Sequence, residues 1–223
     1  MKKEIKSYVL RAGRISPRQQ YALDHHLEKL TLPMQPTPWC LTEVFGREAD
    51  TIVEIGFGMG ASLYTMATSC PELNFIGVEV HRAGLGSLAA DLVDGGLTNV
   101  RIAPFDAYEV FRTCIRDSSL AGVQVFFPDP WPKKRHHKRR LIQPDFVHLL
   151  VSKLKPGGFI HCATDWREYA CHMQSVLSSH PLLTNQHAAG GFIDRPMARP
   201  LTKFERRGLQ LGHEVLDLIF VRN

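Results

Sequence analysis

The stretch TIVEIGFGMGAS, from Thr51 to Ser62, joins a short β-branched apolar run to a turn with glycines at alternate positions. Its first five residues predict a buried strand, and the segment after Gly60 predicts a helix. Gly56, Gly58 and Gly60 allow the backbone to turn tightly and approach a ligand, with the N-terminus of the next helix directed at it. The stretch therefore predicts an open α/β sheet with a ligand site beyond this strand, although a glycine turn can also serve packing alone.

The chain beyond this stretch alternates short apolar runs with longer amphipathic segments, which is typical of a parallel sheet with crossover helices. Strands are predicted over residues 51–55, 74–80, 100–105, 123–127 and 158–164, and helices over residues 60–70, 82–94, 107–117, 144–154 and 166–179. A last apolar run, residues 214–221, follows without an intervening helix, and this predicts a hairpin that inserts an antiparallel strand into the sheet. Residues 51–223 are expected to form a single domain. Residues 1–50 are expected to form an N-terminal arm and helical extension, with helical periodicity over residues 17–30 and a flexible first part of about fifteen residues.

Length and composition describe one globular domain, because 223 residues with 44% apolar and 22% charged content suffice for a full core. The five cysteines never form a CxxC pair, which argues against a disulfide framework or a zinc site and fits a reducing cytosol. The N-terminus lacks the apolar core of a signal peptide, and no apolar run reaches membrane-spanning length. We therefore expect a cytoplasmic protein, monomer or homodimer, with no membrane partner and no metal.

The formal net charge is +5, but six of the basic residues fall within one internal block, Lys133 to Arg140. The block contains no acidic residue and follows the stretch FFPDPWP, residues 126–132, where an apolar run ends. A like-charge block of this kind is either a solvated loop or a contact for nucleic acid, and its internal position beside a strand end favours the second. His136 and His137 have no third partner at metal-ligand spacing, so they are interpreted as polar loop residues.

Acidic residues lie at the ends of the first two predicted strands, at the edge where an α/β sheet binds ligands. Gly56, Gly58 and Ala61 also satisfy the GxGxxG/A dinucleotide pattern, but Glu54 would repel the phosphates of a dinucleotide. A cationic cofactor without phosphates, such as S-adenosylmethionine, would tolerate this carboxylate. Glu79, about twenty positions beyond the glycines, could accept hydrogen bonds from ribose hydroxyls or could be a solvated strand-end carboxylate.

Three further predicted strands each place an aspartate at the same edge. Asp106 could accept a hydrogen bond from the adenine amine, and it could also cap the following helix. Asp129 lies between Pro128 and Pro130, which hold its carboxylate at a fixed place, with a plain turn as the alternative role. Asp165 could face a substrate or cap the next helix.

Five segments together resemble the bacterial tRNA (guanine-N7)-methyltransferase family, and the resemblance extends from about Arg11 to the C-terminus. The segments are EIGFGMGASL (54–63), GVEVHRAGLG (77–86), FFPDPWPKKRHHKRRL (126–141), ATDWREYA (163–170) and TKFERRG (202–208). The resemblance implies an α/β class I methyltransferase fold, which is Rossmann-like, with a seven-stranded mostly parallel sheet, one antiparallel strand and helices on both faces. It also implies S-adenosylmethionine as cofactor and tRNA as partner. The implied products are S-adenosylhomocysteine and 7-methylguanosine at position 46 of the tRNA variable loop.

The resemblance further implies roles for individual residues, with Asp129 as the catalytic one. The implied cofactor-binding residues are Glu54, Gly56, Gly58, Gly60, Glu79, Asp106, Ala107 and Asp129. The implied substrate-binding residues are Lys133, Asp165, Thr202, Lys203, Phe204 and Glu205. The implied RNA-contacting residues are Arg135, His136, His137, Lys138, Arg139 and Arg140.

The chemistry of the reaction agrees with these roles. Guanine N7 carries an in-plane lone pair and no proton, so it needs no strong general base, only alignment with the methyl and the sulfur. An anionic Asp129 could accept from guanine N1–H and the exocyclic amine while stabilising the developing positive charge, and Asp165 could share this task. The base has to leave its stack, and Trp131, Trp166 and Phe204 could stack on it or simply pack at the core or rim.

Three other functions are compatible with parts of the sequence. A methyltransferase acting on a small molecule or a protein would keep the glycine turn and Glu79 but would leave the cationic block unexplained. A non-enzymatic RNA-binding module would not need the acidic strand ends. A nicotinamide dehydrogenase is disfavoured by Glu54 and by the strand-rich C-terminus.

Overall fold

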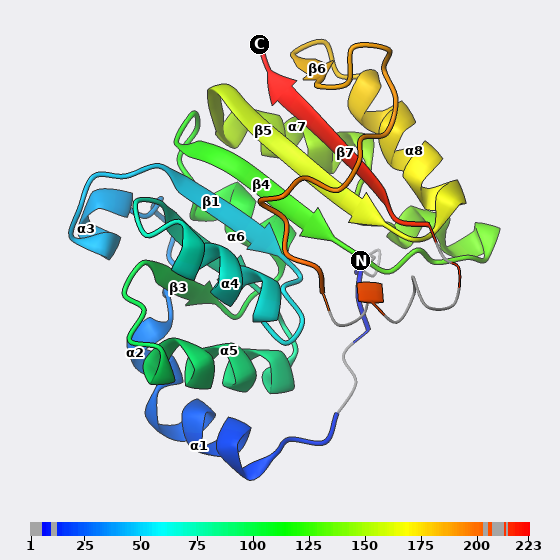
Figure 1. Ribbon diagram of the computed structural model, residues 1–223. Helices are drawn as coiled ribbons and strands as arrows, with labels where there is room; N and C mark the ends of the chain where they lie inside the picture. Colours follow the sequence, from blue (N-terminus) through cyan, green and yellow to red (C-terminus); the bar gives the residue numbers. More distant parts are fainter. Residues whose placement is uncertain (1–5, 10–12, 203–204, 207–211, 213) are drawn as a thin grey trace, which may run out of the picture.

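The computed structural model describes residues 6–9, 13–202, 205–206, 212 and 214–223 of the chain. The strands are β1 (Thr51–Ile55), β2 (Asn74–Val78), β3 (Val100–Ala103), β4 (Leu120–Phe126), β5 (Leu154–Thr164), β6 (Leu183–Asn185) and β7 (Leu216–Arg222). They form a seven-stranded sheet in the order β3-β2-β1-β4-β5-β7-β6 (Figure 1). Strands β1 to β5 pair in parallel, whereas β7 is antiparallel to both β5 and β6. The predicted fold class is confirmed, including the antiparallel strand inserted at the end of the chain.

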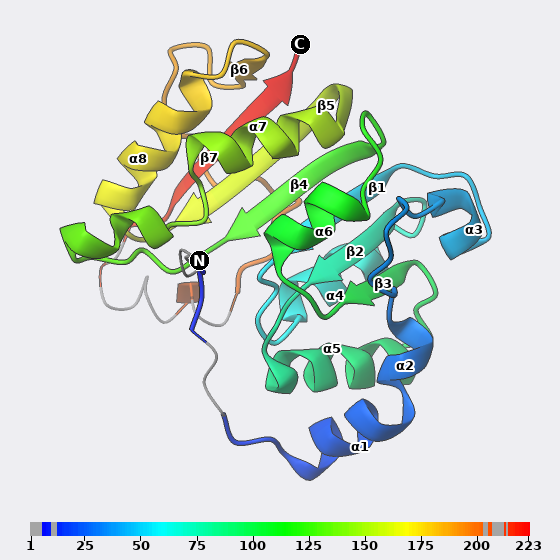
Figure 2. The ribbon, with the colours of Figure 1, turned by 180° about the vertical axis from the view of Figure 1, so that it is seen from behind.

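The chain before the sheet forms α1 (Pro17–His25), α2 (Leu27–Leu30) and α3 (Leu41–Phe45), and the later helices are α4 (Ala61–Ser69), α5 (Arg82–Asp94), α6 (Ala107–Thr113), the 3-10 helix η1 (Lys134–Arg139), α7 (Pro144–Lys153) and α8 (Arg167–Ser178). Helices cover both faces of the sheet (Figures 1 and 2). On one face, α4 and α5 pack with Phe75 and Ile102; on the other, α6, α7 and α8 pack with Val123 and Ile160. Each fully buried side chain of this kind contributes roughly 1.5–3 kcal/mol to stability.

The helix α1 begins where the sequence supplies a complete set of capping groups. The Ser16 hydroxyl accepts from the Gln19 N–H, and the Gln19 side chain accepts from the Ser16 N–H at 2.8 Å. Pro17 occupies the first helical position, where its missing N–H costs nothing. The helix packs against α5 through the buried Ala22.

Several predicted boundaries shift by a few residues, for reasons that the backbone makes clear. β2 ends at Val78 instead of Val80 because the Glu79 side chain takes the N–H groups of Val80 and His81, which would otherwise extend the strand. β5 begins at Leu154 instead of Gly158 because Leu154 pairs with Leu120 across an irregular register. β1 and α5 match their predicted ranges.

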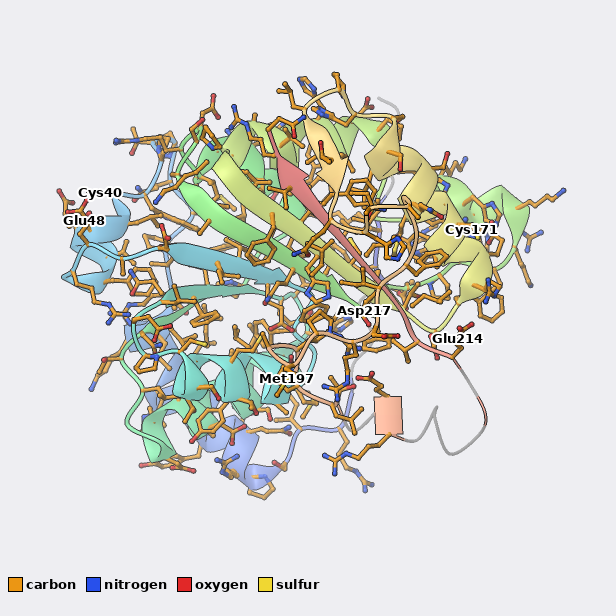
Figure 3. All side chains as sticks on the ribbon, turned by 45° about the horizontal axis from the view of Figure 1, so that its top comes forward. Cys40, Glu48, Cys171, Met197, Glu214 and Asp217 are labelled. Carbon is orange, nitrogen blue, oxygen red and sulfur yellow. The ribbon has the colours of Figure 1, made fainter. Side chains whose placement is uncertain are left out.

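The segment between β6 and β7, residues 186–200, crosses the sheet on the face that carries α4 (Figure 1). We call it the crossing segment. Ile193 on it donates from its backbone N–H to the carbonyl of Asp217 in β7, at 3.0 Å, whereas Met197 is fully exposed (Figure 3). Within the described part of the chain, no helix is long and apolar enough to cross a membrane, and no three metal-ligating side chains gather into a group that could hold a metal ion.

Candidate active site

A cavity of about 330 Å³ opens at the carboxyl ends of the central parallel strands. We call it the strand-end cavity. Its walls come from residues that follow β1, β2, β3 and β4, together with a short N-terminal stretch; they include Gly56, Gly58, Glu79, Phe105, Phe127 and Asp129. Its position is the edge at which open α/β sheets bind their ligands, and its size suits a small molecule or a cofactor.

The glycine turn after β1 is shaped by its own backbone and by the helix α5. Gly58 and Gly60 have φ angles of 57° and 85°, in the left-handed region that a β-carbon disfavours. A β-carbon on Gly84, in the first turn of α5, would lie 2.0 Å from the carbonyl oxygen of Gly58. The turn and the helix are therefore in direct backbone contact, and position 84 has no room for a side chain.

The Glu79 carboxylate joins the end of β2 to this glycine turn. Its Oε2 accepts a hydrogen bond from the Gly58 N–H at 3.0 Å. Its Oε1 accepts from the N–H groups of Val80 at 2.7 Å and His81 at 3.0 Å. The alternative of a solvated strand-end carboxylate is wrong, because the residue is only 7% exposed. Glu79 is held in one place on the wall of the cavity.

Glu54 is a buried carboxylate that lacks a full set of hydrogen-bond partners. It is 2% exposed, and among the described residues its Oε2 has no hydrogen-bond partner. Burial, and then the nearby charge of Glu79, raise the pKa of Glu54 from 4.5 to about 8. An unpartnered carboxylate behind a glycine turn fits a ligand that brings positive charge, and it does not fit a diphosphate.

Asp106 and Ala107 follow β3 at the start of α6. The Asp106 Oδ1 accepts from the Tyr108 N–H at 2.9 Å, so its predicted role as a helix cap is confirmed. Ala107 lines the strand-end cavity, whereas Asp106 lines an adjoining cavity of about 310 Å³ together with Tyr108. The two residues therefore stand at the boundary between the two hollows.

The loop after β4 carries Asp129 between two aromatic residues in an unfavourable backbone conformation. Phe127 and Trp131 have φ angles of 51° and 46°. For bulky side chains such angles cost on the order of 1–3 kcal/mol each, and they persist only where surrounding structure imposes them. Asp129 lines both the strand-end cavity and a neighbouring cavity of about 390 Å³ formed with His81 and Trp131, which we call the outer cavity.

Most of the cationic block, Lys134–Arg139, forms the 3-10 helix η1 on the surface beside this loop. Lys133, Lys134, Arg135 and Lys138 are exposed, and none of their side chains is buried against the core. His136 meets the edge of Trp131, with ring centroids 5.8 Å apart. Partial burial and then the nearby arginines and lysines lower its pKa. These side chains present positive charge next to the outer cavity.

Arg139 binds the N-terminal stretch, residues 6–9, to the loop after β4. Its guanidinium lies 3.9 Å from the centroid of the Trp131 ring and donates to the carbonyls of Lys6 and Tyr8 at 3.1 and 3.2 Å. The Trp131 Nε1–H donates to the carbonyl of Ser7 at 3.0 Å. Ser7 and Tyr8 line the strand-end cavity, so this stretch forms one of its walls. The sequence pattern did not indicate this wall, because the contacts join residues that lie far apart along the chain.

Two residues with predicted external contacts are engaged inside the protein instead. The predicted RNA contact of Arg140 is wrong, because its guanidinium is buried inside the protein. It forms a bidentate ion pair with the Glu168 carboxylate and donates from Nε to the Pro130 carbonyl at 2.9 Å. The predicted contact between Glu205 and the substrate is wrong as well. This residue is 3% exposed, and both carboxylate oxygens accept from the Arg199 guanidinium, at 2.6 and 2.8 Å.

The remaining predicted residues lie around the same edge. Lys133 is exposed at the start of the cationic block, and Asp165 is half-buried directly after β5. The alternative role of Asp165 as a helix cap is not seen, because α8 has Trp166 at its N-cap without a side-chain cap. The Thr202 hydroxyl accepts from the Glu205 N–H at 3.0 Å. Lys203 and Phe204 lie outside the described residues.

Comparison with known proteins places the chain among methyltransferases. A family model described as "Putative methyltransferase" matches residues 48–218. The chain is 60% identical over 225 residues to a tRNA (guanine-N(7)-)-methyltransferase of Legionella pneumophila (strain Paris), covering 100% of this chain and 95% of the relative. It is 53% identical over 220 residues to a protein of the same name from Shewanella pealeana, covering 99% and 93%.

Solved structures share the fold at low sequence identity. A 16S rRNA methyltransferase, KamB, has a TM-score of 0.57 at 15% identity, covering 82% of this chain and 92% of that one. TrmN from Thermus thermophilus also has a TM-score of 0.57, at 16% identity, covering 82% of this chain and 47% of that one. At such identities the similarity establishes the fold alone.

Proposed function

This chain belongs to the tRNA (guanine-N7)-methyltransferase family, and we propose that it transfers the methyl group of S-adenosylmethionine to N7 of a guanine in tRNA at the strand-end cavity. The guanine is nucleotide 46 of the variable loop, and the products are 7-methylguanosine and S-adenosylhomocysteine. The observation that carries the proposal is the place of Asp129, which borders the strand-end cavity and the outer cavity at once. A methyl donor on one side and a base on the other would meet there.

The strand-end cavity suits the cofactor through its acidic residues. S-adenosylmethionine supplies an electrophilic methyl on a positively charged sulfur, and it also carries an ammonium group. Glu54 offers a buried carboxylate without a full set of partners for that positive charge. Glu79, fixed by three backbone N–H groups, still has lone pairs for the ribose hydroxyls. Asp106 and Ala107 lie where the adenine would reach the cavity boundary.

The outer cavity suits the guanine. Asp129 can accept hydrogen bonds from the N1–H and the exocyclic amine of the base, which turns N7 toward the methyl. The N7 lone pair then forms the new bond to the methyl carbon while the carbon–sulfur bond breaks and its electron pair stays on sulfur. Because the purine becomes positively charged, the Asp129 carboxylate stabilises the transition state more than the ground state. Asp165, at the end of the neighbouring strand, is placed to share this task.

The cationic block suits the phosphates of a tRNA next to an extruded base. Lys133, Arg135 and Lys138 are exposed beside the outer cavity, and His136 and His137 lie between them. Each phosphate that such a side chain neutralises releases counterions, which makes binding dependent on salt. Arg139 already stacks on Trp131 and holds the N-terminal stretch, so it contributes to RNA binding indirectly, by fixing the conformation of this loop.

The protein is proposed to act in the cytoplasm, where unpaired thiols are stable and tRNA is processed. All five cysteines are free, and Cys40 and Cys171 are exposed at the surface (Figure 3). Exposed free thiols favour a reducing compartment.

Transfer of a labelled methyl group tests the proposed function. The protein is incubated with labelled S-adenosylmethionine and, in separate reactions, with unmodified tRNA, with a protein extract and with a metabolite mixture. The proposal predicts incorporation into tRNA alone. Incorporation only into metabolites or proteins would contradict it, and so would binding of tRNA without any transfer.

A further inference from the structure

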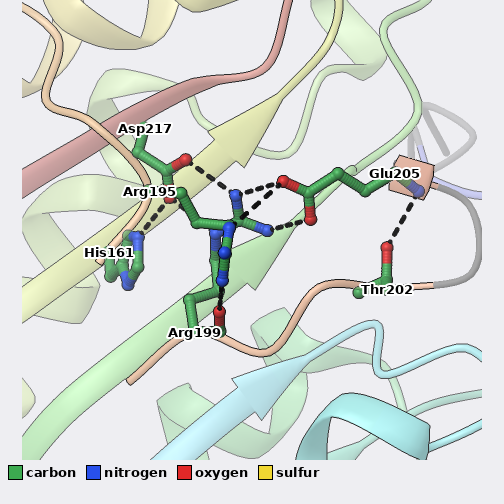
Figure 4. A network of polar contacts seen from close by, with 6 residues as sticks. All are labelled: His161, Arg195, Arg199, Thr202, Glu205 and Asp217. Atoms are coloured by element: carbon green, nitrogen blue, oxygen red, sulfur yellow. Dashed lines mark hydrogen bonds and ion pairs between the residues drawn. The ribbon is translucent and has the colours of Figure 1, made fainter. Parts of the chain in front are cut away.

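The guanidinium of Arg199, at the end of the crossing segment, is buried between two carboxylates from different parts of the chain (Figure 4). Its Nη atoms donate to both oxygens of Glu205 at 2.6 and 2.8 Å. Its Nε and one Nη donate to both oxygens of Asp217 in β7, at 2.7 and 2.9 Å. Arg199 is 1% exposed and both carboxylates are at most 3% exposed, so the three groups form a desolvated ionic cluster.

This cluster is anchored in the sheet on its inner side. The Asp217 Oδ1 lies 2.7 Å from Nε2 of His161, which is buried in β5 (Figure 4). On the outer side, Arg195 donates to the Arg199 carbonyl at 2.7 Å and approaches Glu205 at 3.9 Å. The planar fork of Arg199 therefore joins two sheet strands to Glu205, in a geometry that a lysine could not reproduce.

The same guanidinium also lies against the loop that carries Asp129. Its central carbon is 5.8 Å from the ring centroid of Phe126 and 5.7 Å from that of Phe127. Both rings line the strand-end cavity, and Phe127 holds the strained φ angle directly before Pro128 and Asp129. A cation packed against these rings helps to impose that angle.

We propose that Arg199 is a positioning residue for methyl transfer, which ties Glu205 and β7 to the end of β4 and so fixes the loop that carries Asp129 beside the outer cavity. The inference rests on the proposed function. Glu205 then acts through Arg199 and does not touch the base. Both of its carboxylate oxygens are bound to the guanidinium, and the residue is only 3% exposed to solvent. The Thr202 hydroxyl, which accepts from the Glu205 N–H, is placed by the same pair.

A double-mutant cycle separates this role from direct contact between Glu205 and the substrate. The proteins are the wild type, Arg199→Met, Glu205→Gln and the double variant, each assayed for kcat, KM for tRNA and Kd for S-adenosylmethionine. If Glu205 acts through Arg199, the double variant is no worse than Arg199→Met, because it removes the carboxylate that the first change left unpaired. If Glu205 binds the guanine by itself, the two losses multiply, and the inference is overturned.

The conservative variant Arg199→Lys keeps the charge and covers the case in which Arg199→Met does not fold. We expect KM for tRNA to rise and kcat/KM to fall by at least about tenfold, with Kd for S-adenosylmethionine within about threefold of the wild type. A purely structural role would weaken cofactor binding and turnover together. If the wild type methylates tRNA and Arg199→Lys has the same kinetics, the inference about Arg199 is wrong while the proposed function stands. If the wild type does not methylate tRNA, the proposed function itself is wrong.

Arg47→Lys is the matched control. The Arg47 guanidinium is likewise held by hydrogen bonds, three in all, to the Asn74 side chain and to the carbonyls of Pro71 and Leu73, but it lies at the opposite end of the strands, beside the start of β2. This variant is expected to lower Tm without changing the KM for tRNA. An equal rise in KM for both lysine variants would mean that lower stability, and not position, explains the effect of Arg199.

Discussion

The Glu79 carboxylate accepts a hydrogen bond from the backbone N–H of Gly58 at 3.0 Å, and this bond ties the end of β2 to the turn after β1. The two residues belong to separate sequence motifs, yet in the fold they form one rigid wall of the strand-end cavity. Because Gly84 of α5 touches the Gly58 carbonyl from the other side, the wall cannot shift without moving the helix. A cofactor that bridges the turn and Glu79 would therefore bind a preorganised surface, and less conformational entropy would be lost on binding.

The contact of Gly84 predicts that Gly84→Ala weakens cofactor binding. A β-carbon 2.0 Å from the Gly58 carbonyl oxygen has to push the turn away and disturb its bond to Glu79. We expect the Kd for S-adenosylmethionine, measured by calorimetry, to rise at least about tenfold. Gly86→Ala is the control, since its β-carbon would press on the Gln19 carbonyl of α1 at 2.6 Å, away from the site. Equal decreases in affinity in both variants would count against the predicted role of the turn.

The buried Glu54 predicts a pH dependence of stability in the cofactor-free protein. Burial, with a contribution from Glu79, raises the pKa of Glu54 from 4.5 to about 8, so the folded protein keeps a proton that the unfolded chain releases. Its contribution to stability is therefore present below pH 4.5 and is lost as the pH rises toward and through about 8. The loss amounts to about 5 kcal/mol at most. Glu54→Gln, neutral at every pH, should lack this decline in urea unfolding between pH 5 and 9, and identical profiles would refute the assignment.

Glu54 also predicts that cofactor binding releases a proton. A ligand that brings positive charge to the buried carboxylate lowers its pKa, so at pH 7 the proton leaves for the buffer. Calorimetry in buffers of different ionisation enthalpy should detect this release in the wild type. The release should vanish in Glu54→Gln, which we expect to bind S-adenosylmethionine about tenfold more weakly. Binding enthalpies that do not depend on the buffer would exclude a contact between Glu54 and the positive part of the cofactor.

The place of Asp129 predicts that Asp129→Asn loses turnover and keeps the cofactor. The amide can still accept one hydrogen bond from guanine, but it cannot stabilise the positive charge that develops on the purine. We expect kcat to fall at least about a hundredfold while Kd for S-adenosylmethionine changes by less than about fivefold. Asp50→Asn, at the opposite end of β1 and paired on the surface with Lys155, is the control for the removal of a carboxylate. Near wild-type turnover in Asp129→Asn would remove this residue from the mechanism.

The difference between exposed and buried residues of the cationic block predicts different salt dependences. Replacing Arg135 and Lys138 by Gln should flatten the slope of log K for tRNA against log salt by about 0.7 to 0.9 for each phosphate that is no longer neutralised. Arg140→Gln should leave the slope unchanged and lower Tm instead, because its guanidinium is bound to Glu168 and to the Pro130 carbonyl. If the salt dependence of tRNA binding changed on replacing Arg140 but not on replacing Arg135, the assignment of Arg135 as the phosphate contact and Arg140 as a structural residue would be wrong.

The sequence predicts the order of strands and helices and the acidic strand ends because these follow from local periodicity and from the topology of an α/β sheet. It predicts neither the burial of Glu205 nor the N-terminal wall of the cavity. Glu205 is buried because it pairs with Arg199, which is bound in turn to Asp217 of β7, and pairing between a loop and a strand leaves no periodic signal. The left-handed φ angles of Phe127 and Trp131 are likewise imposed by tertiary contacts, against the intrinsic preference of aromatic residues.

Mapping the modified base tests the central claim most directly. Unmodified tRNA is incubated with the protein and S-adenosylmethionine, and the chain is then cleaved chemically at 7-methylguanosine and sized. A single cleavage at position 46 of the variable loop, absent with Asp129→Asn and with a transcript that carries adenine at that position, is the result that the proposed function predicts. Cleavage at other guanines, or methylated tRNA that resists this cleavage, would contradict transfer to N7 of that guanine.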